Sequence, residues 1–333
     1  MHRASGRGRR RTLWCTAVLL CAAVALGGWG LYRRLDRNLA TTDIGAALGS
    51  DRPPRSGTSM NILVLGSDTR AGANSTYGAH ISGARSDTTM LLHVEGDRKH
   101  ATVVSIPRDT VVDRPACPLP HGGTAPEAKA AMFNSAYGVG GSACTVKTVE
   151  HLSRIRVDHV VEVDFTGFKR LIDVIGGVEV TTDQNIHDPK SGLDLAAGTH
   201  RLHGEQALAL VRTRYGIGDG SDLGRIQLQQ RFMAALVEQL HGGRLLTNPA
   251  RLYRVADAAT SALTTDEDLG SLRALTSLAR GLSGIGADDI RFRTLPVKPY
   301  PRDPNRVMAH EPAARALWES LRSGGPLPPD GEG

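Results

Sequence analysis

The sequence predicts a layered α/β domain preceded by one hydrophobic N-terminal helix. Short apolar runs of strand length alternate with longer stretches whose apolar residues recur at helical spacing. A charge-free, mostly apolar stretch stands near the N-terminus at residues 13–32. The 333 residues are enough to bury a sizeable core, and no clear linker divides the chain after residue 58. We therefore expect one extracytoplasmic domain over 59–325, followed by a short tail at 326–333.

Residues 13–32 have the length of a transmembrane anchor, because about 20 helical residues span the hydrocarbon core of a bilayer. Five arginines precede this stretch, and Arg33 and Arg34 follow it, so the positive-inside rule places residues 1–12 in the cytoplasm. A cleaved signal peptide, with Ala23–Ala25 as the cleavage site, is the alternative. An interfacial belt of Trp29 and Tyr32 favours the anchor. The expected localisation is the cytoplasmic membrane, with a single pass and the domain outside.

The elements after the anchor follow from composition and periodicity. Residues 33–58 are polar, contain a Pro-Pro pair and are predicted to be a stalk. Strands are expected at 60–66, 88–94, 101–107, 159–165, 178–180 and 290–297, with the second and third joined as a hairpin. Helices are expected at 125–137, 146–155, 168–177, 204–214 and 223–240, twice within 248–285, and at 313–321. Residues 138–143 are predicted to be a loop and residues 183–203 to be irregular.

Charge and cysteine content exclude two classes of function. The chain has 40 Lys and Arg against 34 Asp and Glu, but seven arginines and no acid lie in residues 1–34. The remainder therefore has 33 basic and 34 acidic side chains, without the basic excess of a nucleic-acid-binding domain. No Cys/His spacing typical of zinc sites occurs. Cys117 and Cys144 lie outside the expected anchor, where an oxidising compartment favours a disulfide over two free thiols.

Charged residues stand at the ends of several predicted strands, where ligands of α/β sheets tend to bind. For any one Asp/Arg neighbour pair, a surface ion pair is the simpler interpretation. Several such stretches together indicate a phosphate site, because guanidinium groups bind phosphate bidentately and carboxylates hold Mg²⁺. No P-loop motif is present. The residues concerned are Asp68, Arg85, Asp87, Arg108, Asp109, Arg212, Arg214 and Arg225.

The motifs around these residues resemble the LytR-CpsA-Psr family. The resemblance covers roughly residues 60–240, in unbroken order, through "NILVLGSDTR", "RSDTTMLLHV", "VVSIPRDT" and "GEQALALVRTRYGIGDGSDLGRIQLQQRF". The helical tail to about residue 322 resembles the extension found in the family. The resemblance implies an α/β/α sandwich with a central mixed sheet and a hydrophobic tunnel for a polyprenyl chain.

The resemblance also implies roles for individual residues. Arg85 and Asp87 match a phosphate clamp and a Mg²⁺ ligand, and Asp68 matches a second metal-associated acid. Arg108 matches the pyrophosphate-binding arginine most important for turnover, with Asp87 as the other catalytic candidate. The remaining pyrophosphate-binding positions are Arg212, Arg214, Arg225 and Gln229. Two positions depart from the family pattern, since Met132 and Leu228 stand where basic residues are common.

The function implied is transfer of a wall glycopolymer from a polyprenyl-pyrophosphate carrier to the 6-hydroxyl of N-acetylmuramic acid in peptidoglycan. The expected cofactor is Mg²⁺ or Mn²⁺, and the expected partners are the lipid-linked donor, the peptidoglycan acceptor and the membrane, with no nucleic acid. Two alternatives remain. One is a pyrophosphatase acting on lipid pyrophosphates without transfer, and the other is a non-catalytic, membrane-anchored regulator.

Overall fold

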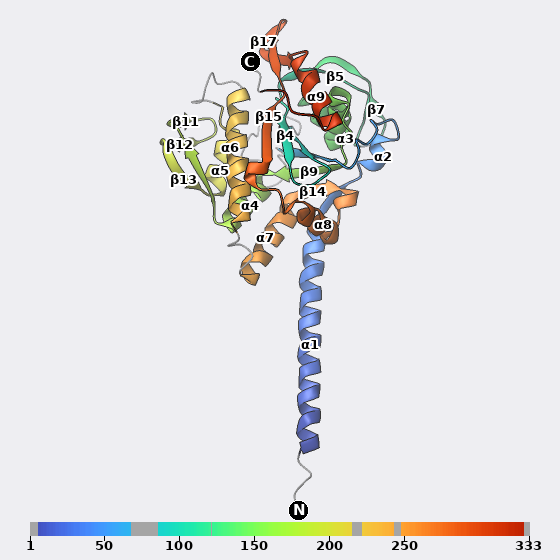
Figure 1. The fold of residues 1–333 in the computed structure, drawn as a ribbon, viewed down its shortest axis with the longest axis vertical. Coiled ribbons are helices and arrows are strands. Elements are labelled where there is room, and N and C mark those ends of the chain that lie inside the picture. The colour runs from blue at the N-terminus through green and yellow to red at the C-terminus, as the bar shows by residue number, and fades with distance from the viewer. Residues whose placement is uncertain (1–5, 68–85, 121, 215–221, 243–247, 330–333) are drawn as a thin grey trace, which may run out of the picture.

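The computed structural model describes residues 6–67, 86–120, 122–214, 222–242 and 248–329, with side chains from residue 19 onward. Figure 1 shows a rounded domain from which one long helix projects. This helix, α1 (Gly6–Arg37), leads into a domain whose centre is a mixed sheet.

The central sheet has seven strands. Their order is β1 (Ala40–Thr42), β14 (Leu263–Asp266), β9 (His159–Asp164), β2 (Met60–Ser67), β3 (Ser86–Val94), β4 (Ala101–Ser105) and β15 (Ile290–Thr294). Pairs β1–β14, β2–β9 and β4–β15 are parallel, whereas β14–β9, β2–β3 and β3–β4 are antiparallel. Because β3 is antiparallel to both β2 and β4, the start of β3 and the end of β4 lie at the same end of the sheet.

Helices cover both faces of this sheet, as the resemblance implied. Leu63 and Leu65 of β2 point to one face and join the main core with residues of α3 (Ser135–Ser153) and α9 (Ala313–Ser323). The alternate residues Val64 and Gly66 point to the other face. A second core lies there among α4 (Phe165–Ile175), α5 (Gly204–Arg212) and α6 (Asp222–His241). The α/β fold with a mixed central sheet is thus confirmed.

The remaining elements are smaller. Next to the second core lie the pairs β10–β13 (Val178–Thr182, Gly198–Leu202) and β11–β12 (Ile186–Asp188, Leu193–Leu195). A four-stranded sheet contains β16 (Val297–Tyr300), β17 (Asp303–Ala309), β5 (Thr110–Arg114) and β8 (Ala128–Met132). The others are α2 (Gly45–Leu48), β6 (Cys117–Pro118), β7 (Thr124–Ala125), α7 (Pro249–Ala262), α8 (Leu272–Leu282) and two 3-10 turns, Glu267–Leu269 and Ala287–Asp289.

Three predicted segments differ from the structure. Most of the helix expected at 125–137 is not helical, and only 135–137 are, as the start of α3. Residues 128–132 are instead the strand β8, because this alanine-rich sequence pairs antiparallel with β5, with Met132 opposite Val111. The loop expected at 138–143 lies inside α3, which kinks at Gly140 and Gly141. A Cβ on Gly140 would lie 2.4 Å from the carbonyl oxygen of Pro118, so the close approach of helix and strand requires glycine. The irregular stretch expected at 183–203 contains three short strands, β11, β12 and β13.

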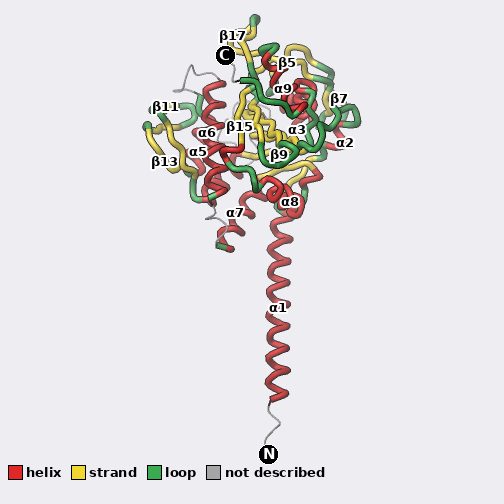
Figure 2. Tube along the Cα trace, viewed as in Figure 1, coloured by secondary structure: helices red, strands yellow, loops and turns green. Residues whose placement is uncertain are grey.

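The structure does not confirm the anchor predicted at 13–32, since no helix in the described part of the chain is both long and apolar enough to cross a membrane. In Figure 2 the projecting helix α1 is continuous until it reaches the domain. Part of the predicted stalk, 33–58, packs on the domain rather than standing free. Strand β1 pairs with β14, and Ile44 and Leu48 are buried in the main core.

A disulfide joins Cys117 of β6 to Cys144 of α3, with an S–S distance of 2.06 Å and a Cα–Cα distance of 5.0 Å. Both cysteines are fully buried in a small cluster with Ala136. The bond closes 27 residues of chain and holds the kinked part of α3 against the β6–β7 ribbon.

Candidate functional site: an arginine pocket beside an apolar pocket

A pocket of about 410 Å³ opens at the edge of the sheet where β3 starts and β4 ends. Its charged residues come from two strand ends, two helix ends and the hairpin of β11 and β12. Asp87 is the second residue of β3, and Arg108 follows β4. On the helical side, Arg212 is the last residue of α5, and Arg225 and Gln229 lie one turn apart near the start of α6. The full lining is Asp87, Thr88, Arg108, Phe165, Asp188, Lys190, Ser191, Val211, Arg212, Arg214, Arg225 and Gln229.

Asp222 links the arginines of the pocket to one another. It is the first residue of α6, where a carboxylate is favoured by the helix dipole. Its carboxylate accepts hydrogen bonds from the backbone N–H of Arg108 (3.1 Å) and from Nη2 of Arg214 (3.2 Å). Nη2 of Arg225 lies 2.5 Å from the same carboxylate. One acid therefore fixes the backbone of one arginine and the guanidinium groups of two others.

Asp87 forms the second ionic centre of the pocket. Its carboxylate accepts a short hydrogen bond from Nη1 of Arg108, and its backbone carbonyl accepts one from Nη2 of Arg225 at 2.8 Å. Burial alone would raise the pKa of Asp87, but Arg108 and Arg225 outweigh it and hold the pKa below 3.8. Burial likewise opposes protonation of Arg108, yet the carboxylates of Asp87 and Asp109 outweigh burial and raise its pKa above the ordinary value. Both groups are therefore charged at neutral pH.

Arg225 is the most buried of these arginines, with 5% of its side chain exposed. Burial lowers its pKa to about 10, although Asp222 opposes the shift, so it is still a cation at neutral pH. Its Nε and that of Arg108 are buried and have no hydrogen-bond partner within the described residues. Unsatisfied buried N–H groups are rare in proteins, and an anion in the pocket would supply acceptors for both.

Gln229 and Arg212 border the pocket on the helical side. Nε2 of Gln229 donates to Oγ1 of Thr88 (3.0 Å) and to the carbonyl of Val211 (2.8 Å), which ties α6 to β3 and α5. The guanidinium of Arg212 lies 5.1 Å from the ring centre of Phe165, within range of a cation–π interaction. These contacts hold the side chains before any ligand binds.

A second pocket, of about 110 Å³, adjoins the first and is apolar. It shares Thr88, Phe165, Val211 and Gln229 with the arginine pocket. The rest of its lining is Gly66, Met90, Val163, Phe168, Leu208, Phe232 and Met233. Cations on one side and hydrocarbon on the other suit a ligand with an anionic head and an apolar tail.

Six of the predicted site residues line the arginine pocket together. They are Asp87, Arg108, Arg212, Arg214, Arg225 and Gln229. Asp68 and Arg85 lie outside the described residues, and Asp109, which lies 3.6 Å from Nε of Arg108, does not line the pocket. The predicted site residues did not include Asp188, Lys190 and Ser191, which also line the pocket. The stretch that contains these three residues was predicted to be irregular. The exposed Arg231 pairs with Asp183 at 3.0 Å and does not line the pocket.

The pocket suits a magnesium ion in its donor chemistry. Mg²⁺ prefers oxygen ligands and commonly takes one or two carboxylates together with substrate phosphates. Asp87 offers an ionised carboxylate at the pocket wall. That carboxylate is engaged by Arg108, so a metal ligated by Asp87 would have to displace this ion pair.

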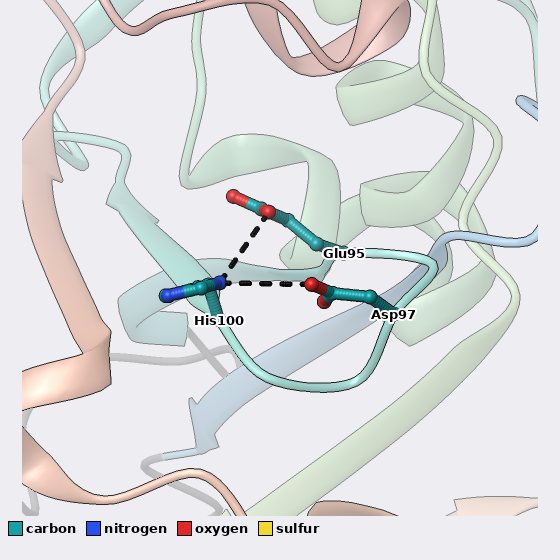
Figure 3. A group of neighbouring side chains, drawn as sticks. All are labelled: Glu95, Asp97 and His100. Carbon is teal, nitrogen blue, oxygen red and sulfur yellow. Dashed lines mark ion pairs between the residues drawn. The ribbon is translucent and has the colours of Figure 1, made fainter.

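A separate group of titratable residues lies in the turn between β3 and β4, at the end of the hairpin opposite the pocket (Figure 3). Nδ1 of His100 is 3.8 Å from a carboxylate oxygen of Glu95 and 3.9 Å from one of Asp97. All three side chains are more than 40% exposed. We assign them as surface ion pairs, since exposed charges of this kind need no metal.

The fold is a layered α/β domain in which an arginine-lined pocket adjoins an apolar one. The family model described as the LytR_cpsA_psr family matches residues 35–323. The chain belongs to this family.

Relatives and solved structures agree with this assignment. The cell wall biosynthesis protein LcpA of Corynebacterium glutamicum is 34% identical over 265 residues, which is 71% of this chain and 50% of LcpA. The chain thus spans about half the length of that relative. The polyisoprenyl-teichoic acid–peptidoglycan teichoic acid transferase TagT of Bacillus subtilis is 34% identical over 257 residues, 72% of this chain and 74% of TagT. A LytR-Csp2A-Psr enzyme from Actinomyces oris has the same fold, with a TM-score of 0.63, 24% identity and coverage of 85% of this chain and 95% of the other.

Proposed function

We propose that this protein transfers a glycopolymer from a polyprenyl-pyrophosphate carrier to a hydroxyl of peptidoglycan, forming a phosphodiester and releasing polyprenyl phosphate. The observation that carries the proposal is that the arginine pocket and the apolar pocket adjoin and share four lining residues. The name of TagT, as a transferase between a polyisoprenyl-linked polymer and peptidoglycan, supports it. The expected acceptor atom is the 6-hydroxyl oxygen of N-acetylmuramic acid.

The proposed transfer depends on where negative charge develops during the reaction. The acceptor oxygen attacks the phosphorus nearer the polymer, the new P–O bond forms, and the bond to the phosphate that carries the lipid breaks. The hydroxyl proton leaves with the released polyprenyl phosphate or passes to water. Negative charge then grows on the leaving phosphate, where Arg108, Arg214 and Arg225 are held by carboxylates at fixed positions. Mg²⁺, held by Asp87 and by the predicted ligand Asp68, would neutralise phosphate charge. Because Asp87 has a lowered pKa, it is better suited to hold a cation than to take up the hydroxyl proton.

The polarity of α6 gives a direction for the lipid. In Figure 1 helix α6 begins at the end of the domain away from α1 and runs toward it. Arg225 and Gln229 are near its start, whereas Phe232 and Met233 of the apolar pocket follow toward α1. A donor with its diphosphate among the arginines would therefore point its tail toward the α1 side. This orientation agrees with the proposal that residues 13–32 anchor the protein in the cytoplasmic membrane.

The decisive test is Arg108→Ala with Arg231→Ala as the matched control. Loss of an arginine that stabilises the transition state should reduce the rate about 10³-fold, whereas loss of the exposed Arg231 should leave it unchanged. The measurement is mass spectrometry of products formed from a lipid-linked donor with and without peptidoglycan. Wild-type transfer by Arg108→Ala would overturn the site assignment. Free polymer phosphate in equal yield with and without acceptor would instead establish a pyrophosphatase.

A further inference from the structure

The turn between β11 and β12 forms one wall of the arginine pocket. Asp188, Lys190 and Ser191 of this turn all line the pocket. The hairpin is anchored because Ile186, Leu193 and Leu195 are buried in the second core, together with residues of α5 and α6. The turn is thus held against the same helices that carry the arginines.

The carboxylate of Asp188 joins this turn to the segment that carries Arg214. Asp188 is 1% exposed, and its Oδ1 accepts hydrogen bonds from the backbone N–H groups of Lys190 (2.9 Å) and Ser191 (3.3 Å). Its Oδ2 accepts one from the backbone N–H of Arg214 at 2.9 Å. A hydroxyl contact of 2.8 Å between Ser191 and Thr213 adds a second link. These three bonds hold the backbones of Lys190 and Arg214 as a unit.

Lys190 brings an additional cation to the rim of the pocket. Its side chain is exposed, whereas Arg225 opposite is buried. An ammonium on a flexible stem can follow a phosphate oxygen that a fixed guanidinium cannot reach. Resting on the proposed function, we propose that the β11–β12 turn belongs to the diphosphate-binding surface. Lys190 binds a phosphate oxygen of the donor, and Asp188 is a positioning residue that sets Lys190 and Arg214 at a fixed separation.

The first experiment measures binding of a short polyprenyl diphosphate without glycan by calorimetry on the full chain in detergent. Lys190→Met should raise the Kd about tenfold, as expected for loss of one charged hydrogen bond. Lys298→Met, which removes an exposed lysine from β16, is the matched control and should bind as the wild type does. The difference between the two variants should shrink at high ionic strength, because an exposed cation is screened.

Two comparisons decide the outcome. If Lys190→Met and Lys298→Met bind equally well while Arg108→Ala binds more weakly, the turn has no part in diphosphate binding and the proposed function stands. If Arg108→Ala also binds as the wild type does and retains wild-type transfer, the proposed function fails. Lys190→Met could instead weaken only the binding of donors that carry a phosphate-containing polymer. In that case Lys190 binds the polymer, and its assignment to the diphosphate is overturned.

The second experiment tests Asp188 as a positioning residue through coupling. In Asp188→Asn the NH2 group of the amide would face one of the three backbone N–H groups, so that hydrogen bond would be lost. The turn and Arg214 should then no longer be held at a fixed separation. Adding Lys190→Met to Asp188→Asn should then raise the Kd less than about threefold instead of about tenfold. A full tenfold effect in the Asp188→Asn background, with the variant folded by circular dichroism, would overturn the positioning role.

Discussion

At the scale of single residues, the pocket consists of arginines that already have carboxylate partners. Arg108 pairs with Asp87, and Arg225 and Arg214 pair with Asp222. Such pairs fix long side chains whose rotamer entropy would otherwise be lost when a ligand binds. The site is therefore preorganised, and its geometry depends on acids as much as on arginines.

A histidine–aspartate pair outside the pocket gives a pH-dependent prediction. Nδ1 of His159 lies 3.3 Å from Oδ1 of Asp266, and this hydrogen bond raises the pKa of His159 above 6.5 despite burial. Asp158 and Asp268 add to the shift. Burial would raise the pKa of Asp266, but His159 and the N–H groups of Val160 and Leu269 lower it below 3.8. The pair joins the start of β9 to the end of β14.

His159→Gln should lower the free energy of unfolding by about 1 kcal/mol at about pH 5.5. Because the folded pKa of His159 is raised, its stabilisation is complete below 6.5 and is lost as the pH rises through that raised pKa. Urea titrations should therefore show the gap between variant and wild type closing by about pH 9. His187→Gln, at an exposed histidine 3.6 Å from Asp194, should show little gap at either pH. A gap for His159→Gln that is independent of pH would contradict the ionic explanation.

Residue roles were predictable from sequence only where a motif fixes them. The arginines and Asp87 stand in recognisable motifs, and the structure brings the described ones together. Lys190 has no such motif. The position of Lys190 depends on a hydrogen bond from the backbone N–H of Arg214 to the carboxylate of Asp188. These two residues are 26 positions apart, so no local pattern predicts their contact.

At the scale of elements, helix α6 builds both pockets. Arg225 and Gln229 face the arginine pocket, and Gln229, Phe232 and Met233 face the apolar one. These positions are spaced by four, three and one residues, so they share one side of the helix. Gln229 lies at the boundary and lines both pockets.

Met233→Glu should separate the two binding functions. The side chain lines the apolar pocket and is only partly buried, so a carboxylate there would oppose a hydrocarbon chain without emptying the core. The Kd for a polyprenyl diphosphate should rise at least about tenfold, while that for inorganic pyrophosphate should change little. Leu240→Glu, at an exposed position of the same helix, is the control and should alter neither value. Equal losses for both ligands would mean that the two pockets do not bind separate parts of the donor.

Elements with strong periodicity were predicted well, and those decided by distant partners were not. The strand hairpin of β3 and β4 and the helix α4, closed by Gly176 with φ +90°, follow from local sequence. Residues 128–132 have helical propensity but are paired to β5, and the kinked start of α3 follows its contact with Pro118. Both errors arise because tertiary contacts override local preference.

At the scale of the whole molecule, α1 stands apart from the domain along much of its length (Figure 1). Its large apolar side chains from Leu19 to Leu31 are 50% or more exposed. Arg33, near the end of the helix, lies 5.1 Å from the Trp29 ring centre. The anchor proposed at residues 13–32 would bury this apolar surface in lipid.

Leu20→Lys with Val24→Lys should release the protein from the membrane. Each lysine near the centre of a membrane-spanning helix costs about 2.5–3.5 kcal/mol, so the pair should move much of the protein from the membrane pellet to the supernatant after a high-salt wash. Leu252→Lys, at an exposed leucine of α7, should leave the distribution unchanged. If the double variant pellets as the wild type does, residues 13–32 are not the anchor.

The paired state of the arginines has a consequence for ligand discrimination. Asp87, Asp109 and Asp222 already occupy the guanidinium groups, so an entering anion must outcompete these built-in rivals. A small singly charged ion such as chloride would replace one carboxylate–guanidinium contact with another single contact, so its binding would be weak. A diphosphate that arrives with a divalent cation offers each displaced partner a new one, since its oxygens replace the carboxylates and its cation takes the freed acid. If the proposed function holds, the acids would favour such a ligand over abundant simple anions.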